Sequence, residues 1–263
     1  MRNIPLVSVV IPTKNSESTI DDCLRSIREQ TYKSIETIIV DNYSKDKTKE
    51  VAQKYGKVLF KGPERSSQRN SGAKFARGDY LLFIDSDMQL TPCVVDECVR
   101  CALKGSDAII IPEITVGKGL WARVRALERS VYVGDALFEC SRFFKKEIFE
   151  KLKGYDEDLT GPEDYDLQSN VEEAGYRVGR IVSPVLHHEE NLRLFPHLRK
   201  RVYYSKSLKR YEQKHPERAK RQLGLQRVSK YRMLIVENPD LGVLVLFLKG
   251  TEYFISKIVN LFY

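Results

Sequence analysis

Short apolar runs recur through the first 111 residues of the chain, and stretches with helical spacing separate them. Runs of this length are too short for a typical globular helix and are typical of strands buried on both faces. Between the runs, apolar residues such as Ile20, Cys23, Leu24 and Ile27 fall three and four positions apart, which predicts amphipathic helices. Strands are expected at residues 6–11, 35–40, 58–60, 80–84 and 108–111, and helices at residues 18–29, 47–55, 66–76 and 92–103. This alternation predicts an α/β fold with a mostly parallel sheet flanked by helices.

The pattern is less regular in the second half of the chain. Thr91 is expected to cap the helix that starts at Pro92, and Trp121 lies in a further amphipathic stretch. Residues 137–144 are expected to return to the sheet, and residues 178–186 to form its last strand. A short helix at 148–152 and a helix from an acidic cluster at 161–167 to about residue 174 lie between them.

Carboxylates follow two of the predicted strands directly. Asp41 comes after the second strand, and Asp85 and Asp87 come after the strand at 80–84. In an open parallel sheet, ligands bind beyond the carboxyl ends of the strands, where these side chains would meet. Carboxylates at i and i+2 can bind one hard cation while a diphosphate supplies further oxygens. The alternative is a polar turn, because Asp and Ser are ordinary turn residues.

Composition and charge narrow the class of protein. The 263 residues are 42% hydrophobic and 30% charged, as expected for a folded soluble or peripheral protein. The five cysteines are odd in number and scattered, which indicates a reducing compartment such as the cytoplasm. Cys98 and Cys101 form a single C-x-x-C within a helical pattern, where a structural role is favoured over a zinc or redox site. The net charge of +8 indicates an anionic partner.

Several motifs stand in one order along residues 5–190. They are VVIPTKN (9–15), IIVDNYSKD (38–46), QRNSGAKFARGDYLLFIDSD (68–87), FFKKEIFEKLKGYDEDL (143–159) and PEDYDL (162–167). In these motifs the chain resembles a family 2 glycosyltransferase with the GT-A nucleotide-diphospho-sugar fold. The resemblance implies inverting transfer of a hexose, such as mannose, glucose or GlcNAc, from a UDP- or GDP-linked donor to an acceptor hydroxyl. It also implies a Mg²⁺ or Mn²⁺ cofactor.

The resemblance also implies roles for individual residues. Asp87 and Asp85 would bind the metal ion, and Asp164, beside Glu163, would be the catalytic base. His187 follows the last strand and is the favoured histidine for completing the metal shell, although an ordinary surface pair with His188 remains the alternative. The residues implied to bind the nucleotide sugar are Pro12, Thr13, Asn15, Asp41, Arg69, Lys74, Asp85 and Ser86. Asn42 and Tyr43 depart from the acid-glycine pair common in the family, which leaves uridine and guanosine both open.

The C-terminal region is strongly basic. Residues 199–232 include thirteen Lys and Arg residues and only two acidic residues, Glu212 and Glu217. This surplus of eleven positive charges exceeds the net charge of +8 of the whole chain. An apolar stretch from residue 241 follows, with Lys249, Glu252, Lys257 and Asn260 on one part of the helical wheel. A polybasic stretch beside an amphipathic helix is typical of attachment to an anionic membrane surface. We therefore expect a catalytic domain at 1–196 and a basic, membrane-associating helical region at 197–263.

These features predict a monotopic enzyme at the cytoplasmic face of the cell membrane. Its acceptor would be a lipid-linked, polyprenyl-type molecule in N-glycan or cell-envelope assembly. The alternatives are a soluble or surface-polysaccharide glycosyltransferase that uses the tail to form a homodimer and, more remotely, a nucleic-acid-binding protein. No RNA-binding or helix-turn-helix signature supports the last of these. A sugar nucleotidyltransferase is disfavoured because residues 12–15 contain no glycine.

Overall fold

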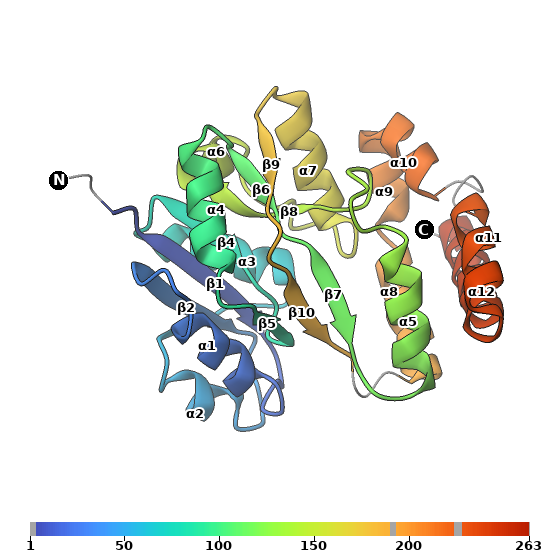
Figure 1. Ribbon diagram of the computed structural model, residues 1–263, viewed down its shortest axis with the longest axis horizontal. Helices are drawn as coiled ribbons and strands as arrows, with labels where there is room; N and C mark the ends of the chain where they lie inside the picture. Colours follow the sequence, from blue (N-terminus) through green and yellow to red (C-terminus); the bar gives the residue numbers. More distant parts are fainter. Residues whose placement is uncertain (1–3, 190–192, 224–227, 263) are drawn as a thin grey trace. The chain divides into compact units, whose positions relative to one another are not determined.

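The computed structural model describes residues 4–189, 193–223 and 228–262 (Figure 1). Arg227 of the basic stretch lies outside these residues. The chain divides into two compact units. The first contains Met1–Glu113, Cys140–Glu157 and Leu167–His187, and the second contains Ile114–Glu139, Asp158–Asp166 and His188–Tyr263. These units interleave along the sequence, and the expected division after residue 196 stays a prediction about folding domains.

A seven-stranded sheet forms the centre of the first unit. Its order is β3 (Lys57–Phe60), β2 (Ile35–Asp41), β1 (Val7–Thr13), β4 (Tyr80–Phe83), β8 (Ser141–Lys145), β6 (Ala108–Ile110) and β9 (Val178–Arg180). Neighbouring strands from β3 to β4 are parallel, as are β6 and β9, whereas β8 runs antiparallel to both β4 and β6. The predicted α/β fold with a mostly parallel sheet is therefore confirmed.

Helices cover both faces of this sheet, which explains the continuous apolar strands. In β4, Tyr80 and Leu82 join one buried cluster, and Leu81 and Phe83 join the other. The first cluster contains residues of α1 (Ile20–Arg28), α2 (Thr48–Ala52) and α4 (Val94–Leu103). The second contains residues of α3 (Arg65–Phe75), α6 (Lys146–Lys151) and the Leu167–Glu173 part of α7 (Glu163–Glu173). A strand with no solvent-facing side has no reason to alternate polar and apolar residues.

The structure corrects several expected elements near the sheet edge. β1 continues through Pro12 to Thr13, and β8 begins only at Ser141. The expected strand at 178–186 is two strands, β9 and β10 (Val185–His188), because Pro184 lacks the N–H that a continuous ladder needs. The expected cap at Thr91 is wrong: its hydroxyl donates to the Pro184 carbonyl at 2.8 Å, and α4 begins at Val94.

Two short strands beyond the main sheet were not expected from the sequence. β5 (Met88–Leu90) follows the D-x-D triplet directly and pairs antiparallel with β10, with His187 opposite Met88. The other strand is β7 (Glu113–Val116). Its first residue, Glu113, belongs to the first unit, and its other residues belong to the second. The pairing of β5 with β10 brings a histidine distant in sequence next to the aspartates.

The second unit is helical. It contains α5 (Leu120–Ser130), α8 (Leu194–Ser205), α9 (Leu208–Lys214), α10 (Pro216–Leu223), α11 (Val228–Glu237) and α12 (Pro239–Phe262). α12 packs against α5, α8 and α11, and Figure 1 shows α11 and α12 side by side. Val124, Tyr231, Leu234, Val245 and Leu248 form its apolar core, and Trp121 packs against this core. Among the helices that the structure describes, none has the length and apolar character needed to span a bilayer.

α12 has apolar side chains on both its buried and its exposed side, and it also buries two charged residues. Lys249 and Glu252 point into the unit, with Glu252 only 3% exposed. Val243, Phe247, Phe254 and Ile258, four and seven residues apart on one stripe, are each more than half exposed. Buried charge therefore fixes one side of this helix, and apolar side chains meet solvent on the other.

Candidate functional site

The loops after β1 and β2 are tied together at the carboxyl edge of the sheet. The buried carboxylate of Asp41 accepts hydrogen bonds from the Ser44 hydroxyl and, at 3.0 Å, from the Ser44 N–H. The Asn15 N–H donates to the same hydroxyl at 2.8 Å, and Asn15 Oδ1 accepts from the Lys45 N–H at 2.9 Å. Asn15 has a φ of 49°, a left-handed conformation that asparagine tolerates better than most residues. The structure thus brings together Asn15 and Asp41, two of the predicted nucleotide-binding residues.

Pro12 and Thr13 occupy the last two positions of β1, and both are buried. The Thr13 carbonyl accepts a hydrogen bond from Gln68 Nε2 at 3.0 Å. The Thr13 hydroxyl is buried and has no hydrogen-bond partner within the described part of the chain. Buried polar atoms without a partner are rare, and they often mark a place where a ligand or water binds.

Three arginines converge on the carboxylate of Asp85. Arg69 of α3 is 1% exposed and its Nη2 lies 2.8 Å from Asp85 Oδ1. Arg65, one helical turn earlier, and Arg142 of β8 lie 3.8 and 3.9 Å from Asp85 Oδ2. Burial alone would raise the pKa of Asp85, but Arg69, Arg65 and Arg142 hold it well below its ordinary value. Asp85 is therefore a carboxylate that stays charged and is surrounded by cations.

Sequence reasoning missed two of these arginines. Arg65 precedes Arg69 by four residues, so their shared helix face could have been found from spacing. Arg142 arrives on an antiparallel strand from far along the chain, and no local pattern marks it. Arg142 also donates to Glu113 at 2.9 Å, which connects it to the next group of residues.

Glu113, His187 and Asp87 form a row beside this arginine cluster. His187 Nδ1 lies 2.7 Å from Glu113 Oε1, and His187 Nε2 lies 3.3 Å from Asp87 Oδ2. If Nδ1 carries the proton that Glu113 accepts, a neutral imidazole turns its Nε2 lone pair toward the carboxylate of Asp87. Two acceptors this close repel each other unless a proton or a cation lies between them. The arrangement also matches metal-binding histidines, whose second nitrogen donates to a carboxylate.

The donor atoms of Asp87 and His187 fit a small divalent cation. Bonds of about 2.1 Å at right angles place neighbouring ligands about 3 Å apart, close to the 3.3 Å seen here. The oxygens of Asp85 face the three arginines, and its contact with a metal ion stays a prediction. Across the described residues, no group of three or more His, Cys, Asp or Glu side chains is arranged to hold a metal ion. The remaining positions of such an ion would need water or a bound anion.

The other predicted residues lie in different places. The Ser86 hydroxyl donates to Ser16 Oγ at 2.9 Å, so it supports the loop after β1. Lys74 lies in the last turn of α3 and is exposed. Glu163 and Asp164 are in the first turn of α7, in the part that belongs to the second unit. Glu163 is buried and accepts a hydrogen bond from the Gly161 N–H.

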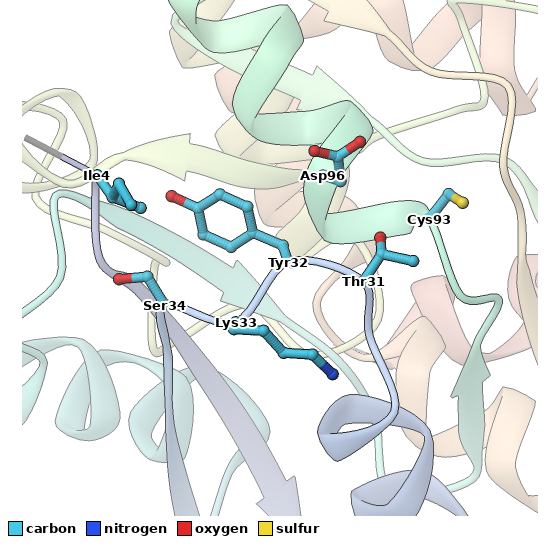
Figure 2. Close-up of a pocket in the computed structure, with 7 residues that line it drawn as sticks. All are labelled: Ile4, Thr31, Tyr32, Lys33, Ser34, Cys93 and Asp96. Carbon is cyan, nitrogen blue, oxygen red and sulfur yellow. The ribbon is translucent and has the colours of Figure 1, made fainter. Parts of the chain in front are cut away.

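A cavity of about 530 Å³ lies elsewhere in the first unit (Figure 2). Its walls come from the residues before β1 and β2 and from the start of α4, so it lies at the amino ends of these strands. Asp41 lies at the carboxyl end of β2, and Asp85 follows that of β4. It is lined by Ile4, Thr31, Tyr32, Lys33, Ser34, Cys93 and Asp96. It contains none of the predicted site residues.

Comparisons with known proteins agree with the fold and the family expected from the motifs. A family model described as "Glycosyl transferase family 2" matches residues 8–161, more than half of the chain. Putative glycosyltransferase EpsH of Bacillus subtilis (strain 168) is 36% identical over 113 residues, which are 40% of this chain and 33% of EpsH. The poly(ribitol-phosphate) beta-N-acetylglucosaminyltransferase TarP of Staphylococcus aureus (strain N315) is 28% identical over 169 residues, 56% of this chain and 51% of TarP. The matches therefore span about a third to a half of these relatives.

Two solved structures are similar in fold. The mannosyltransferase PcManGT from Pyrobaculum calidifontis, in complex with GDP-Man and Mn²⁺, matches with a TM-score of 0.69 at 16% identity, over 99% of this chain and 88% of that one. Residues 1–349 of S. aureus TarS, in complex with UDP-GlcNAc, match with a TM-score of 0.60 at 15% identity, over 97% of this chain and 90% of that one. At these identities the likeness shows the fold, which both structures share with the chain.

Proposed function

The chain belongs to glycosyl transferase family 2, and from this premise we propose that it transfers a hexose from a nucleotide diphosphate sugar to an acceptor hydroxyl with inversion. The observation that carries the proposal is the convergence of Arg65, Arg69 and Arg142 on Asp85, beside the row formed by Asp87, His187 and Glu113. Guanidinium groups recognise phosphate oxygens strongly. Such a cluster at the carboxyl edge of a parallel sheet suits a bound diphosphate.

The donor site follows from these contacts. The cross-linked loops that carry Asn15 and Asp41 would hold the nucleoside, and the arginines would hold the diphosphate. Asp87 and His187 would hold a divalent ion, Mg²⁺ or Mn²⁺, against the diphosphate oxygens. When bound there, the ion would supply Lewis-acid stabilisation of the leaving group. A structure with GDP-Man and Mn²⁺ and one with UDP-GlcNAc share the fold, which supports this donor class and leaves both bases open.

Asp164 would act as the catalytic base. It would accept the proton of the acceptor hydroxyl, whose oxygen attacks the anomeric carbon from the face opposite the leaving diphosphate. The arginines would stabilise the negative charge that grows on the diphosphate as the glycosidic bond breaks.

The donor site can be tested by calorimetry with UDP, GDP and dTDP, each with and without Mn²⁺. We expect one nucleotide to bind more tightly when Mn²⁺ is present, and Asp87→Asn to lose that gain. Asp96→Asn, which changes the same type of side chain in α4, away from the carboxyl ends of the strands, serves as the control. Equal Mn²⁺ dependence in the wild type and Asp87→Asn would contradict the proposed site.

For the acceptor, we propose a membrane lipid-linked, polyprenyl-type molecule. The exposed apolar stripe of α12 supports this, as do the exposed basic residues Arg199, Lys200 and Lys206 on the same unit. Each basic residue near an anionic bilayer adds about 1 kcal/mol of attraction. A cavity of about 250 Å³ is lined in part by Lys206, Arg210 and Asp158. Because Arg210 pairs with Asp158, Lys206 would be the cation that meets a phosphate group of such an acceptor. The enzyme would then be monotopic at the cytoplasmic face of the membrane.

Vesicle flotation tests this attachment. With phosphatidylglycerol vesicles, the wild type should float, and Phe247→Ser combined with Phe254→Ser should stay in the soluble fraction. Phe75→Ser, an exposed aromatic residue of the first unit, is the matched control. If the double variant floats like the wild type, the apolar stripe has another use, and a concentration-dependent dimer measured by ultracentrifugation would favour self-association.

A further inference from the structure

The segment that leads to Asp164 is fixed by the helices of the C-terminal region. The Thr160 N–H donates to Ser207 Oγ at 3.1 Å, and the same hydroxyl donates back to the Thr160 carbonyl at 2.7 Å. Arg210 pairs with Asp158 at 3.1 Å. These contacts connect the loop before α7 to the start of α9, although the two are almost 50 residues apart in the sequence.

The loop before α7 comes close to α8 at Gly161. Its φ is 105°, and a Cβ added there would lie 2.8 Å from the Cβ of Tyr204. A residue other than glycine would be strained by the conformation and would push α8 away. The loop before α7 is therefore fitted to the surface of these helices.

The strongest contact is made by Asp166. Its carboxylate is buried at 1% exposure, and its Oδ1 lies 2.9 Å from His215 Nε2 and 2.7 Å from Lys214 Nζ. His215 is itself 2% exposed, and its ring lies against that of Tyr211 at 5.5 Å. A buried carboxylate is stable only when donors of this kind replace its water. Two neighbouring residues at the end of α9 thus hold one carboxylate in the first turn of α7.

We propose that His215 and Lys214 are positioning residues for the transfer reaction, acting through Asp166 on Asp164. Residues two apart on a helix point about 200° away from each other. Holding Asp166 inward therefore turns Asp164 outward, and the structure has Asp164 partly exposed where Asp166 is buried. This inference rests on the proposed function, in which Asp164 is the catalytic base. It gives the basic C-terminal helices a part in aligning that base, in addition to any contact with a membrane.

The test compares His215→Ala with His215→Gln. A glutamine can place its Nε2 near the position of the histidine Nε2 and still donate to Asp166. We expect His215→Ala to lower kcat per folded molecule about 10- to 100-fold, the scale of a misplacement near 1 Å. KM for the nucleotide sugar should stay unchanged, and His215→Gln should restore most of kcat. Hydrogen exchange of the amides of residues 161–166 should be faster in His215→Ala than in the wild type.

Lys249→Met is the matched control, because Lys249 pairs with the buried carboxylates of Glu128 and Glu252 in the same unit and not with Asp166. It should lower stability while kcat per folded molecule and exchange at residues 161–166 stay as in the wild type. A normal kcat per folded molecule in His215→Ala would overturn the proposal, as would a loss that His215→Gln does not restore. If the wild type transfers no sugar from any UDP- or GDP-linked donor, the proposed function fails, and the exchange comparison still decides whether His215 holds this segment.

Discussion

Two groups of charged residues, one in each unit, both pair carboxylates with cations and differ in how fully they are buried. In the second unit, Glu128 and Glu252 share Lys249 at 2.7 and 2.8 Å, and Glu252 also pairs with His197 at 2.7 Å and Arg201 at 3.3 Å. In the first unit, Asp85 has one close cation, and two others lie at 3.8 and 3.9 Å. Asp87, beside them, has a side chain that is 42% exposed.

The difference distinguishes charge that fixes helices from charge that we propose binds a ligand. The acids of the second unit are sealed between α5, α8 and α12, where their partners replace water and fix the helices. The charges of the first unit lie at strand ends, with cations beyond hydrogen-bond distance of Asp85 and a carboxylate that meets solvent. Burial of charge alone therefore does not mark a ligand site. The cluster at the strand ends is the better candidate, because it includes a carboxylate, Asp87, that is exposed to solvent.

The largest effect expected from a single substitution separates catalysis from donor binding. Asp164→Asn should lower the transfer rate about 10²- to 10⁴-fold, because a general base contributes that much, while donor affinity measured by calorimetry stays unchanged. Glu173→Gln, at the other end of α7, is the control. Transfer near the wild-type rate in Asp164→Asn would remove Asp164 from the mechanism.

Lys249→Met tests the sealed cluster. It leaves Glu128 and Glu252 buried without their shared cation, and breaking a buried pair in this way costs about 3–5 kcal/mol. The free energy of unfolding, measured by denaturant titration, should fall by this amount, while nucleotide affinity stays the same. Lys257→Met, on the exposed part of the same helix, should change stability by about 0.5 kcal/mol or less. A loss of nucleotide affinity in Lys249→Met would break the distinction between the two clusters.

Acid should weaken the sealed cluster. Burial raises the pKa of Glu128, but Lys249 and Arg125 lower it from 4.5 to about 2, and the pKa of Glu252 is also well below 4.5. A lowered folded-state pKa gives stability that is present above pH 4.5 and is lost as the pH falls toward about 2. For Glu128 this amounts to about 3 kcal/mol. Stability measured from pH 6 to pH 3 should therefore decrease, and a flat profile would contradict the pairing.

The smallest expected effect concerns the cations that lie farther from Asp85. Arg142→Met should weaken nucleotide diphosphate binding about 10- to 100-fold, the worth of a hydrogen bond to a charged group, with little loss of stability. Lys145→Met, on the same strand but paired with Asp107, should leave nucleotide affinity unchanged. Equal affinities in the wild type and Arg142→Met would show that Arg142 only supports Glu113.

Much of the first unit could be predicted because its information is local. β-rich apolar runs specify strands, helical spacing specifies helices, and the position of Asp41 and Asp85 directly after strands specifies the edge at which they lie. The predicted site lacked some of its residues because the information that places them is not local. Arg142 and Glu113 reach it from β8 and β7, and His187 reaches it through the pairing of β5 with β10, which no short stretch of sequence encodes.

The sequence by itself determined the alternation of strands and helices, the family motifs and the strong positive charge of the C-terminal region. The tertiary structure decided how these charges are used. Residues 100 positions apart come within 3.3 Å at Asp87 and His187, and Asp166 meets His215 across 49 positions. The orientation of α12 was also decided by folding: Val245 and Leu248 pack in the apolar core and Lys249 and Glu252 pair with buried partners, which leaves the apolar stripe of the helix outside.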